Sequence, residues 1–126
     1  MMIDHASLGT RQFDTAIDFY AAALPSLGYT LQHRNEREAA FGTPERWDFW
    51  LYPAGADDAV LGSRMHMAFS APSRDAVIAF HEAALARGGV SAVAPGERPD
   101  ISPRYFGTVL QDPDGHRIEA VHWSAA

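Results

Sequence analysis

The chain contains an internal repeat, and this repeat constrains the fold more than any other feature. Residues from Arg64 to Gly89 align without a gap to residues from Ile3 to Gly28, at an offset of 61 positions. In both copies a histidine stands near the start, an apolar stripe at helical spacing follows, and a glycine closes the segment. The sequence therefore predicts two related halves, each opened by a histidine. The eight identical pairs are His5/His66, Asp14/Asp75, Ile17/Ile78, Phe19/Phe80, Ala22/Ala83, Ala23/Ala84, Leu24/Leu85 and Gly28/Gly89.

Length and composition predict one domain, residues 1–126, of an ordinary globular kind, with 47% hydrophobic and 21% charged residues. The absence of cysteine excludes disulfides, thiolate metal ligands and cysteine nucleophiles. A net charge of −6 argues against nucleic acid as a partner. No apolar run approaches the roughly 18 residues of a membrane span, and no export signal is visible. We therefore expect a cytoplasmic protein with no membrane contact.

Each half has the pattern strand, helix, strand, strand, strand. The first module covers about residues 1–53, a polar Gly-containing linker about 54–62, and the second module about 63–126. Strands are predicted at 2–9, 29–32, 39–42, 47–52, 65–70, 90–93, 105–110 and 117–123. Helices are predicted over 13–24 and from a cap at Ser73, and the Pro- and Gly-rich stretch 95–103 is predicted as a loop.

Strand alternation places three polar residues on one face of the predicted sheets. In the second half Met67, Phe69, Ile118 and Ala120 form the core row, so His66 and Glu119 point the other way. In the first strand Ala6 and Leu8 form the core row, so His5 points opposite. Trp47, Phe49 and Leu51 form a further core row, which leaves Asp48, Trp50 and Tyr52 on the polar face with Arg64 and Arg117.

Two imidazoles and a carboxylate are suitable ligands for Zn²⁺, Fe²⁺, Mn²⁺ or Ni²⁺. A single strand histidine is more often structural, but two histidines at equivalent positions of a repeat, with a carboxylate on the same face, favour a metal site at His5, His66 and Glu119. The remaining histidines, with Asp112 and Asp114, are interpreted as structural, turn or solvated residues.

Several segments together resemble the vicinal oxygen chelate superfamily, which comprises glyoxalases, bleomycin resistance proteins and extradiol dioxygenases. The run from Asp112 to Glu119, with sequence DPDGHRIE, is the most specific of them. The others are Ile3-Asp4-His5, Ala16 to Tyr20, and Met65 to Phe69. The resemblance covers essentially the whole chain. It implies an α+β fold in which two βαβββ modules form a half-open mixed β-barrel with helices outside, around one divalent metal ion (Fe, Mn, Zn or Ni) held by His5, His66 and Glu119.

One position departs from the glyoxalase pattern. Members of the glyoxalase I type have a fourth ligand, a carboxylate on the last strand of the first module. Counted from the turn prolines, Pro44 to Trp50 matches Pro113 to Glu119, so a tryptophan occupies that position here. This departure argues against a standard lactoylglutathione lyase. Three ligands are more similar to the extradiol dioxygenases or to fosfomycin-resistance thiol transferases, although the dioxygenases have longer chains and the transferases' phosphonate-binding residues have no clear counterpart.

The leading hypothesis is a metal-dependent lyase, dioxygenase or thiol transferase acting on a small oxygenated molecule, with the metal as a Lewis acid. Tyr52, Asp48, Arg64 and Arg117 are candidates for orienting substrate or moving protons, and Trp50, Tyr52 and Tyr105 for lining the pocket.

The alternative is a non-catalytic drug- or metabolite-binding resistance protein of the bleomycin-resistance type, which would use aromatic side chains and no metal. A third possibility is a vestigial member without metal. The resemblance also implies a homodimer with a small-molecule ligand, in which His5 could be supplied by the partner of the chain that supplies His66 and Glu119.

Overall fold

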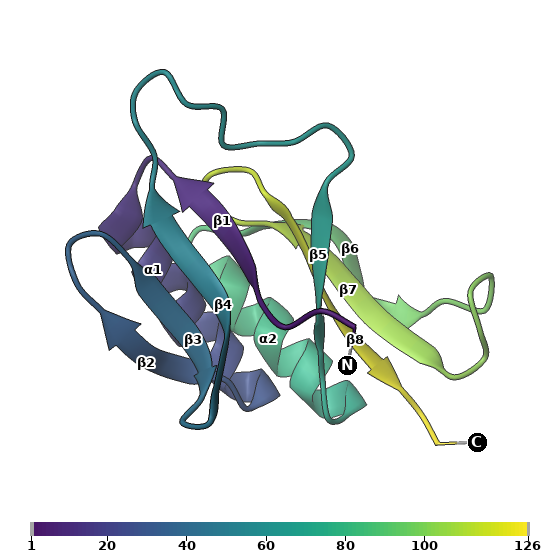
Figure 1. Ribbon diagram of the computed structural model, residues 1–126. Coiled ribbons are helices and arrows are strands. Elements are labelled where there is room, and N and C mark those ends of the chain that lie inside the picture. The colour runs from purple at the N-terminus through teal and green to yellow at the C-terminus, as the bar shows by residue number, and fades with distance from the viewer. Residues whose placement is uncertain (1, 126) are drawn as a thin grey trace.

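The computed structural model describes residues 2–125, and these form two modules of the same design (Figure 1). The elements of the first are β1 (Ala6–Thr10), α1 (Phe13–Ala23), the short 3₁₀ helix η1 (Leu24–Leu27), β2 (Thr30–Arg34), β3 (Ala39–Thr43) and β4 (Arg46–Pro53). Those of the second are β5 (His66–Ser70), α2 (Arg74–Ala86), β6 (Val90–Glu97), β7 (Tyr105–Gln111) and β8 (Arg117–Trp123).

Both modules form a four-stranded mixed sheet with the same strand order. The first sheet runs β1-β4-β3-β2 and the second β5-β8-β7-β6. In each sheet the first strand of the module pairs in parallel with the last, and the other pairs are antiparallel. The predicted α+β fold with two βαβββ modules is confirmed.

The helices cover one face of each sheet and pack against each other (Figure 1). Phe19 and Tyr20 of α1 and Phe80 of α2 are fully buried in a single core cluster to which both modules contribute. Phe49 of β4 and Phe69 of β5 meet edge to face across the module boundary, with ring centroids 5.2 Å apart. Among the described residues no helix covers the opposite face of either sheet (Figure 1), and Trp50 of the first sheet and His66 and Glu119 of the second lie on that face.

Some helix and strand ends follow local sequence signals, and others are set by strand pairing. The Ser73 hydroxyl accepts a hydrogen bond from the Ala76 amide at 3.0 Å, so the predicted cap at the start of α2 is confirmed. β1 begins at Ala6 rather than at residue 2, because its pairing with β4 starts at Ala6↔Phe49 and earlier described residues have no ladder partner. β6 continues through the predicted loop as far as Glu97, where register shifts accommodate Pro95.

The prediction that Trp47 belongs to the core row is wrong. Phe49 and Leu51 are buried, but Trp47 is 40% exposed. The register between β3 and β4 shifts between Phe41↔Phe49 and Gly42↔Trp47, and this bulge turns Trp47 to the outer face. Gly42 has φ +152°, and a Cβ there would lie 2.0 Å from the Arg46 carbonyl oxygen, so the bulge requires glycine.

Candidate functional site

His66 and Glu119 form the centre of the candidate site, on the helix-free face of the second sheet. β5 and β8 pair in parallel with His66 opposite Arg117 and Ala68 opposite Glu119, so both side chains project from the same face. His66 Nε2 lies 3.0 Å from Glu119 Oε2. The Glu119 side chain is only 13% exposed and that of His66 is 51% exposed. An imidazole nitrogen and a sheltered carboxylate oxygen therefore lie close enough together to bind the same ligand or ion.

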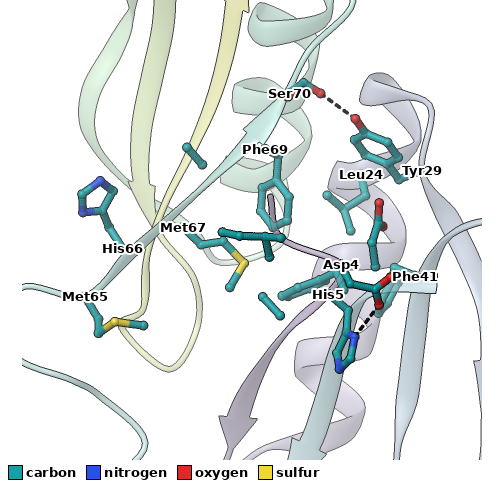
Figure 2. A pocket seen from close by; sticks show the side chains of 15 residues that line it. Asp4, His5, Leu24, Tyr29, Phe41, Met65, His66, Met67, Phe69 and Ser70 are labelled. Carbon is teal, nitrogen blue, oxygen red and sulfur yellow. Dashed lines mark hydrogen bonds and ion pairs between the residues drawn. The ribbon is translucent and has the colours of Figure 1, made fainter. Parts of the chain in front are cut away.

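His5 does not join this pair within one chain. It lies immediately before β1, its side chain is 60% exposed, and its Nδ1 lies 2.7 Å from Asp4 Oδ1. The hydrogen bond with His5 lowers the pKa of the Asp4 carboxyl. The ligand atoms of His5, His66 and Glu119 do not gather within 4.8 Å of one another anywhere in residues 2–125, and Figure 2 shows the two imidazole rings pointing away from each other.

A pocket of about 540 Å³ lies between the two modules, and both histidines line it (Figure 2). Its floor is apolar and is made by Leu24, Phe41, Phe49, Met67 and Phe69. Asp48 lines the pocket and is half-buried, as is Tyr29, whose hydroxyl donates a hydrogen bond to the Ser70 carbonyl oxygen at 3.0 Å. Partial burial raises the pKa of the Tyr29 phenol, and the negative charge of Asp48 adds to the effect. The pocket therefore combines an apolar floor with a polar rim, as ligand sites do.

Tyr105 of β7 lies on the same face of the second sheet as Glu119, whose ladder partner is Val109. Burial raises the pKa of the Tyr105 phenol, and the charge of Glu119 raises it further. The Tyr105 ring packs edge to face against Trp123, with centroids 5.2 Å apart. Tyr105 therefore stays protonated at neutral pH, which makes it a hydrogen-bond donor on the same sheet face as the His66–Glu119 pair.

The corresponding face of the first sheet is aromatic. Ser7, two residues after His5, pairs with Trp50, as Ala68, two residues after His66, pairs with Glu119. Trp50 therefore occupies the place of Glu119 in the first module. Its ring stacks on Tyr52 at 6.2 Å, and its Nε1 donates to the Trp47 carbonyl oxygen at 2.9 Å. Trp47 in turn stacks on His33, with centroids 5.4 Å apart.

A second group of possible ligands comprises Asp112, Asp114 and His116, whose nearest ligand atoms lie within 4.8 Å of one another. Sequence reasoning interpreted these residues as structural, and their hydrogen bonds agree with that interpretation. Asp112 Oδ1 accepts the Asp114 and His116 amides at 3.0 and 2.9 Å, and its Oδ2 accepts the buried Tyr20 hydroxyl at 2.6 Å. Burial raises the pKa of the Asp112 carboxyl, against the opposing effect of the hydrogen bond from Tyr20.

The other two members of this group bind the first module. Asp114 accepts the Thr10 hydroxyl at 2.5 Å and the Arg11 amide at 3.2 Å. His116 Nε2 donates to the Gly9 carbonyl oxygen at 2.8 Å. Every carboxylate oxygen of the group already accepts a hydrogen bond, so a cation would have to displace protein donors. What the sequence did not reveal is that this turn connects the modules, because its partners lie about a hundred residues away in the chain.

Comparisons with known proteins agree with the fold. A sequence model of the Glyoxalase/Bleomycin resistance protein/Dioxygenase superfamily matches residues 2–120. A glyoxalase/bleomycin resistance protein from Albidiferax ferrireducens is similar, with 26% identity, a TM-score of 0.85, and 97% of this chain and 99% of that chain covered. A family enzyme from Burkholderia phytofirmans shares the fold at 17% identity and TM-score 0.75, with 96% of this chain and 98% of that one covered.

No curated protein matches the sequence. Within the described residues no helix is long and apolar enough to cross a membrane. The matched family model covers almost the whole chain and both modules. The chain belongs to the glyoxalase/bleomycin resistance protein/dioxygenase superfamily.

Proposed function

We propose that the chain is a divalent-metal-dependent enzyme acting on a small oxygenated molecule. The observation that carries this proposal is the His66–Glu119 pair, with 3.0 Å between Nε2 and Oε2 and the carboxylate sheltered on the helix-free face of its sheet. These two donors fit Fe²⁺, Mn²⁺, Zn²⁺ or Ni²⁺, and a second imidazole would complete a facial set of three with open positions.

We propose that His5 of the partner subunit supplies that third ligand in a homodimer. Support comes from the repeat, because His5 is the counterpart of His66, and from the position of His5, which is exposed and apart from the other two ligands in its own chain. Two-fold symmetry would then build two equivalent sites, each from the first module of one subunit and the second module of the other.

In this site the metal would act as a Lewis acid toward vicinal oxygens of the substrate. The protein's own contribution would come from groups around it. Tyr105 would donate a hydrogen bond to developing negative charge, since its phenol is protonated at neutral pH. Asp48 lines the pocket between the modules, and its side chain forms no hydrogen bond or ion pair within residues 2–125. It is a candidate for moving a proton, as is Tyr52, which does not line that pocket.

Trp50 bears on the reaction type. It occupies the position where a fourth, carboxylate ligand would stand. A tryptophan cannot bind the metal or serve as a base, so the arrangement favours chemistry that needs three protein ligands, of the dioxygenase or thiol-transferase type, over lactoylglutathione lyase chemistry. Trp50 lines neither of the two pockets at His66 within one chain, and in the proposed dimer it would form an apolar wall for the substrate.

Metal content tests the ligand set. Protein purified without chelators is expected to contain about one equivalent of divalent metal per chain, measured by elemental analysis, and His66→Ala and Glu119→Gln are expected to lose it. His81→Ala is the matched control, since His81 hydrogen-bonds Ser91 on the surface of the second module. Sub-stoichiometric metal that the two ligand variants leave unchanged would rule out the enzyme hypothesis.

A mixed dimer tests the sharing of the site. His5→Ala and His66→Ala chains carrying different tags are co-expressed, and the heterodimer is isolated through both tags. A shared site leaves one intact set of ligands, so about half of the wild-type metal is expected to return. A site contained in one chain leaves no intact set, and the heterodimer would then hold no more metal than either variant alone.

The second candidate function is non-catalytic binding of a planar molecule. The aromatic surface of the first sheet favours it, since Trp47 and Tyr52 are about 40% exposed and stack on His33 and Trp50. Binding of a flat aromatic drug by metal-free protein, followed through tryptophan fluorescence and lost in Trp50→Ala, would support this alternative. Wild-type fluorescence that does not respond to such drugs would exclude it.

A further inference from the structure

A second, smaller pocket adjoins His66 at the start of strand β5. It has a volume of about 230 Å³ and is lined by two arginines, Arg64 and Arg117, with His66 between them in the sequence and beside Arg117 in the ladder. The rest of its lining is apolar or glycine, apart from the buried His116. No carboxylate of the described residues lines this pocket, although the chain carries a net charge of −6.

The two guanidinium groups differ from several others among the described residues, which are paired with carboxylates. Arg34, Arg74 and Arg98 each pair with a carboxylate at 2.6–2.9 Å. The side chains of Arg64 and Arg117 form no ion pair or hydrogen bond with any of residues 2–125. Their donors are therefore available, and a guanidinium presents several N–H groups in a planar fork that matches the oxygens of a carboxylate or phosphate.

Arg64 is also held in an unusual backbone conformation. Its φ is +62°, and no other non-glycine residue among residues 2–125 has positive φ. Such a conformation is costly for a side chain with a Cβ, and strain of this kind is concentrated at binding and catalytic sites. Here it occurs two residues before His66, at the point where the long connection between the modules enters β5.

We infer that Arg64 and Arg117 form an oxyanion-binding pocket beside the His66–Glu119 pair, and that the substrate carries a carboxylate or phosphate group. As a statement about substrate, this inference rests on the metal site proposed above. The volume of this pocket limits the size of the anionic group that it can hold. Drug-sized ligands occupy roughly 300–1,000 Å³, so a pocket of about 230 Å³ takes an anionic end group and not a whole nucleotide or planar drug.

Binding of small anions tests the pocket directly. Inorganic phosphate and malonate are titrated separately into the purified protein at low chloride, with binding followed by calorimetry and by the imidazole NMR signals of His66. The two anions distinguish tetrahedral from carboxylate specificity. Arg64→Gln and Arg117→Gln are each expected to weaken binding by about tenfold or more, because each removes a charge-assisted contact.

Arg87→Gln is the matched control, since it removes the same charge from the exposed end of α2 and is expected to leave anion affinity unchanged. Arg117→Lys keeps a charge and is expected to recover part of the binding, which separates loss of the contact from misfolding. Wild-type protein that binds neither anion, or a Gln double variant that binds as wild type does, would overturn the inference.

Elemental analysis of the same samples keeps this inference distinct from the metal proposal. Anion binding in protein without stoichiometric metal would leave the arginine pocket standing and remove the enzyme hypothesis. Metal bound at one equivalent, with no binding of either anion, would support the metal site and remove the arginine pocket.

Discussion

The two modules share a backbone plan but present different chemistry on their helix-free faces. The second presents Glu119 against His66, with Tyr105 on the same face of the sheet. The first presents Trp50 at the place of Glu119, stacked on Tyr52 and close to Trp47. The shared strand order thus determines which positions of each module face this surface. The chemistry of the surface depends on the residues at those positions. One module holds polar ligands, and the other offers aromatic surface.

The modules also differ at the turn before their last strand. In the second module Asp112 and Asp114 accept hydrogen bonds from Tyr20, Thr10 and Arg11 of the first. In the first module the matching turn, Thr43-Pro44-Glu45, forms no such link to the second within the described residues. One turn therefore connects the modules, and the other only reverses the chain.

The largest effect is expected from breaking this connecting turn. Asp112→Ala removes the acceptor of three hydrogen bonds, two of them from buried groups, and is expected to lower the free energy of unfolding by about 3 kcal/mol or more. Glu45→Ala, at the first turn, is expected to change it by less than about 0.5 kcal/mol. Urea unfolding followed by circular dichroism measures both, and equal effects would contradict the difference between the turns.

The next effect concerns the bulge that exposes Trp47. Gly42→Ala places a methyl group 2.0 Å from the Arg46 carbonyl oxygen at a positive φ, and about 1–3 kcal/mol of destabilisation is expected. Gly88→Ala is the control, since Gly88 has φ +92° and a Cβ there would meet nothing within 4 Å, so only the smaller backbone cost applies. Thermal unfolding compares the two, and a Gly88 variant as unstable as the Gly42 variant would argue against the steric explanation.

A substitution can also make the two faces alike. Trp50→Glu places a carboxylate at the counterpart of Glu119, and if the sites are shared as proposed, metal affinity is expected to rise by about tenfold, roughly 1.4 kcal/mol. Competition with a fluorescent zinc chelator measures the affinity. Trp50→Gln removes the same indole without adding a charge and is expected to show no gain. A Glu variant that binds metal no better than the Gln variant would place residue 50 away from the metal.

The smallest effect is a pH dependence. Burial raises the folded-state pKa of Asp112 above its value in the unfolded chain. Between the two pKa values the folded state therefore binds more protons than the unfolded state. The stabilisation from this group is fully present below the unfolded-state pKa and decreases as pH rises through the folded-state pKa. The stability of wild type relative to Asp112→Asn is expected to fall as pH rises through the folded-state pKa of this carboxyl. A difference independent of pH in urea titrations would contradict it.

Much of the fold could be predicted from sequence because local signals and the repeat agree. The helical stripes, the Ser73 cap and the last strand at residues 117–123 follow directly from spacing and residue type. Trp47 could not be predicted correctly, since alternation assumes an unbroken ladder and the bulge beside Gly42 depends on pairing with another strand. The strand through Pro95 failed as a prediction for the same reason.

The candidate site divides along similar lines. Alternation was sufficient to put His66 and Glu119 on one face, because both belong to paired strands of one sheet. The distance from His5 to this pair depends on how two separate sheets are arranged, which no local pattern encodes. That the Arg64 and Arg117 side chains have no carboxylate partner could not be predicted from the sequence either, because it depends on which carboxylates lie nearby in space.

The most recognisable run of the sequence is Asp112-Pro113-Asp114-Gly115. Its two carboxylates form hydrogen bonds that hold the two modules together. Farther along the run from Asp112 to Glu119, the Glu119 carboxylate faces His66 and Arg117 lines the adjoining pocket. A relative could therefore keep Asp112-Pro113-Asp114-Gly115 intact while replacing the residues that react, and it would still be identified by the same motif. The motif therefore indicates how the two modules are joined. Activity has to be inferred from the side chains outside the motif that face the candidate site.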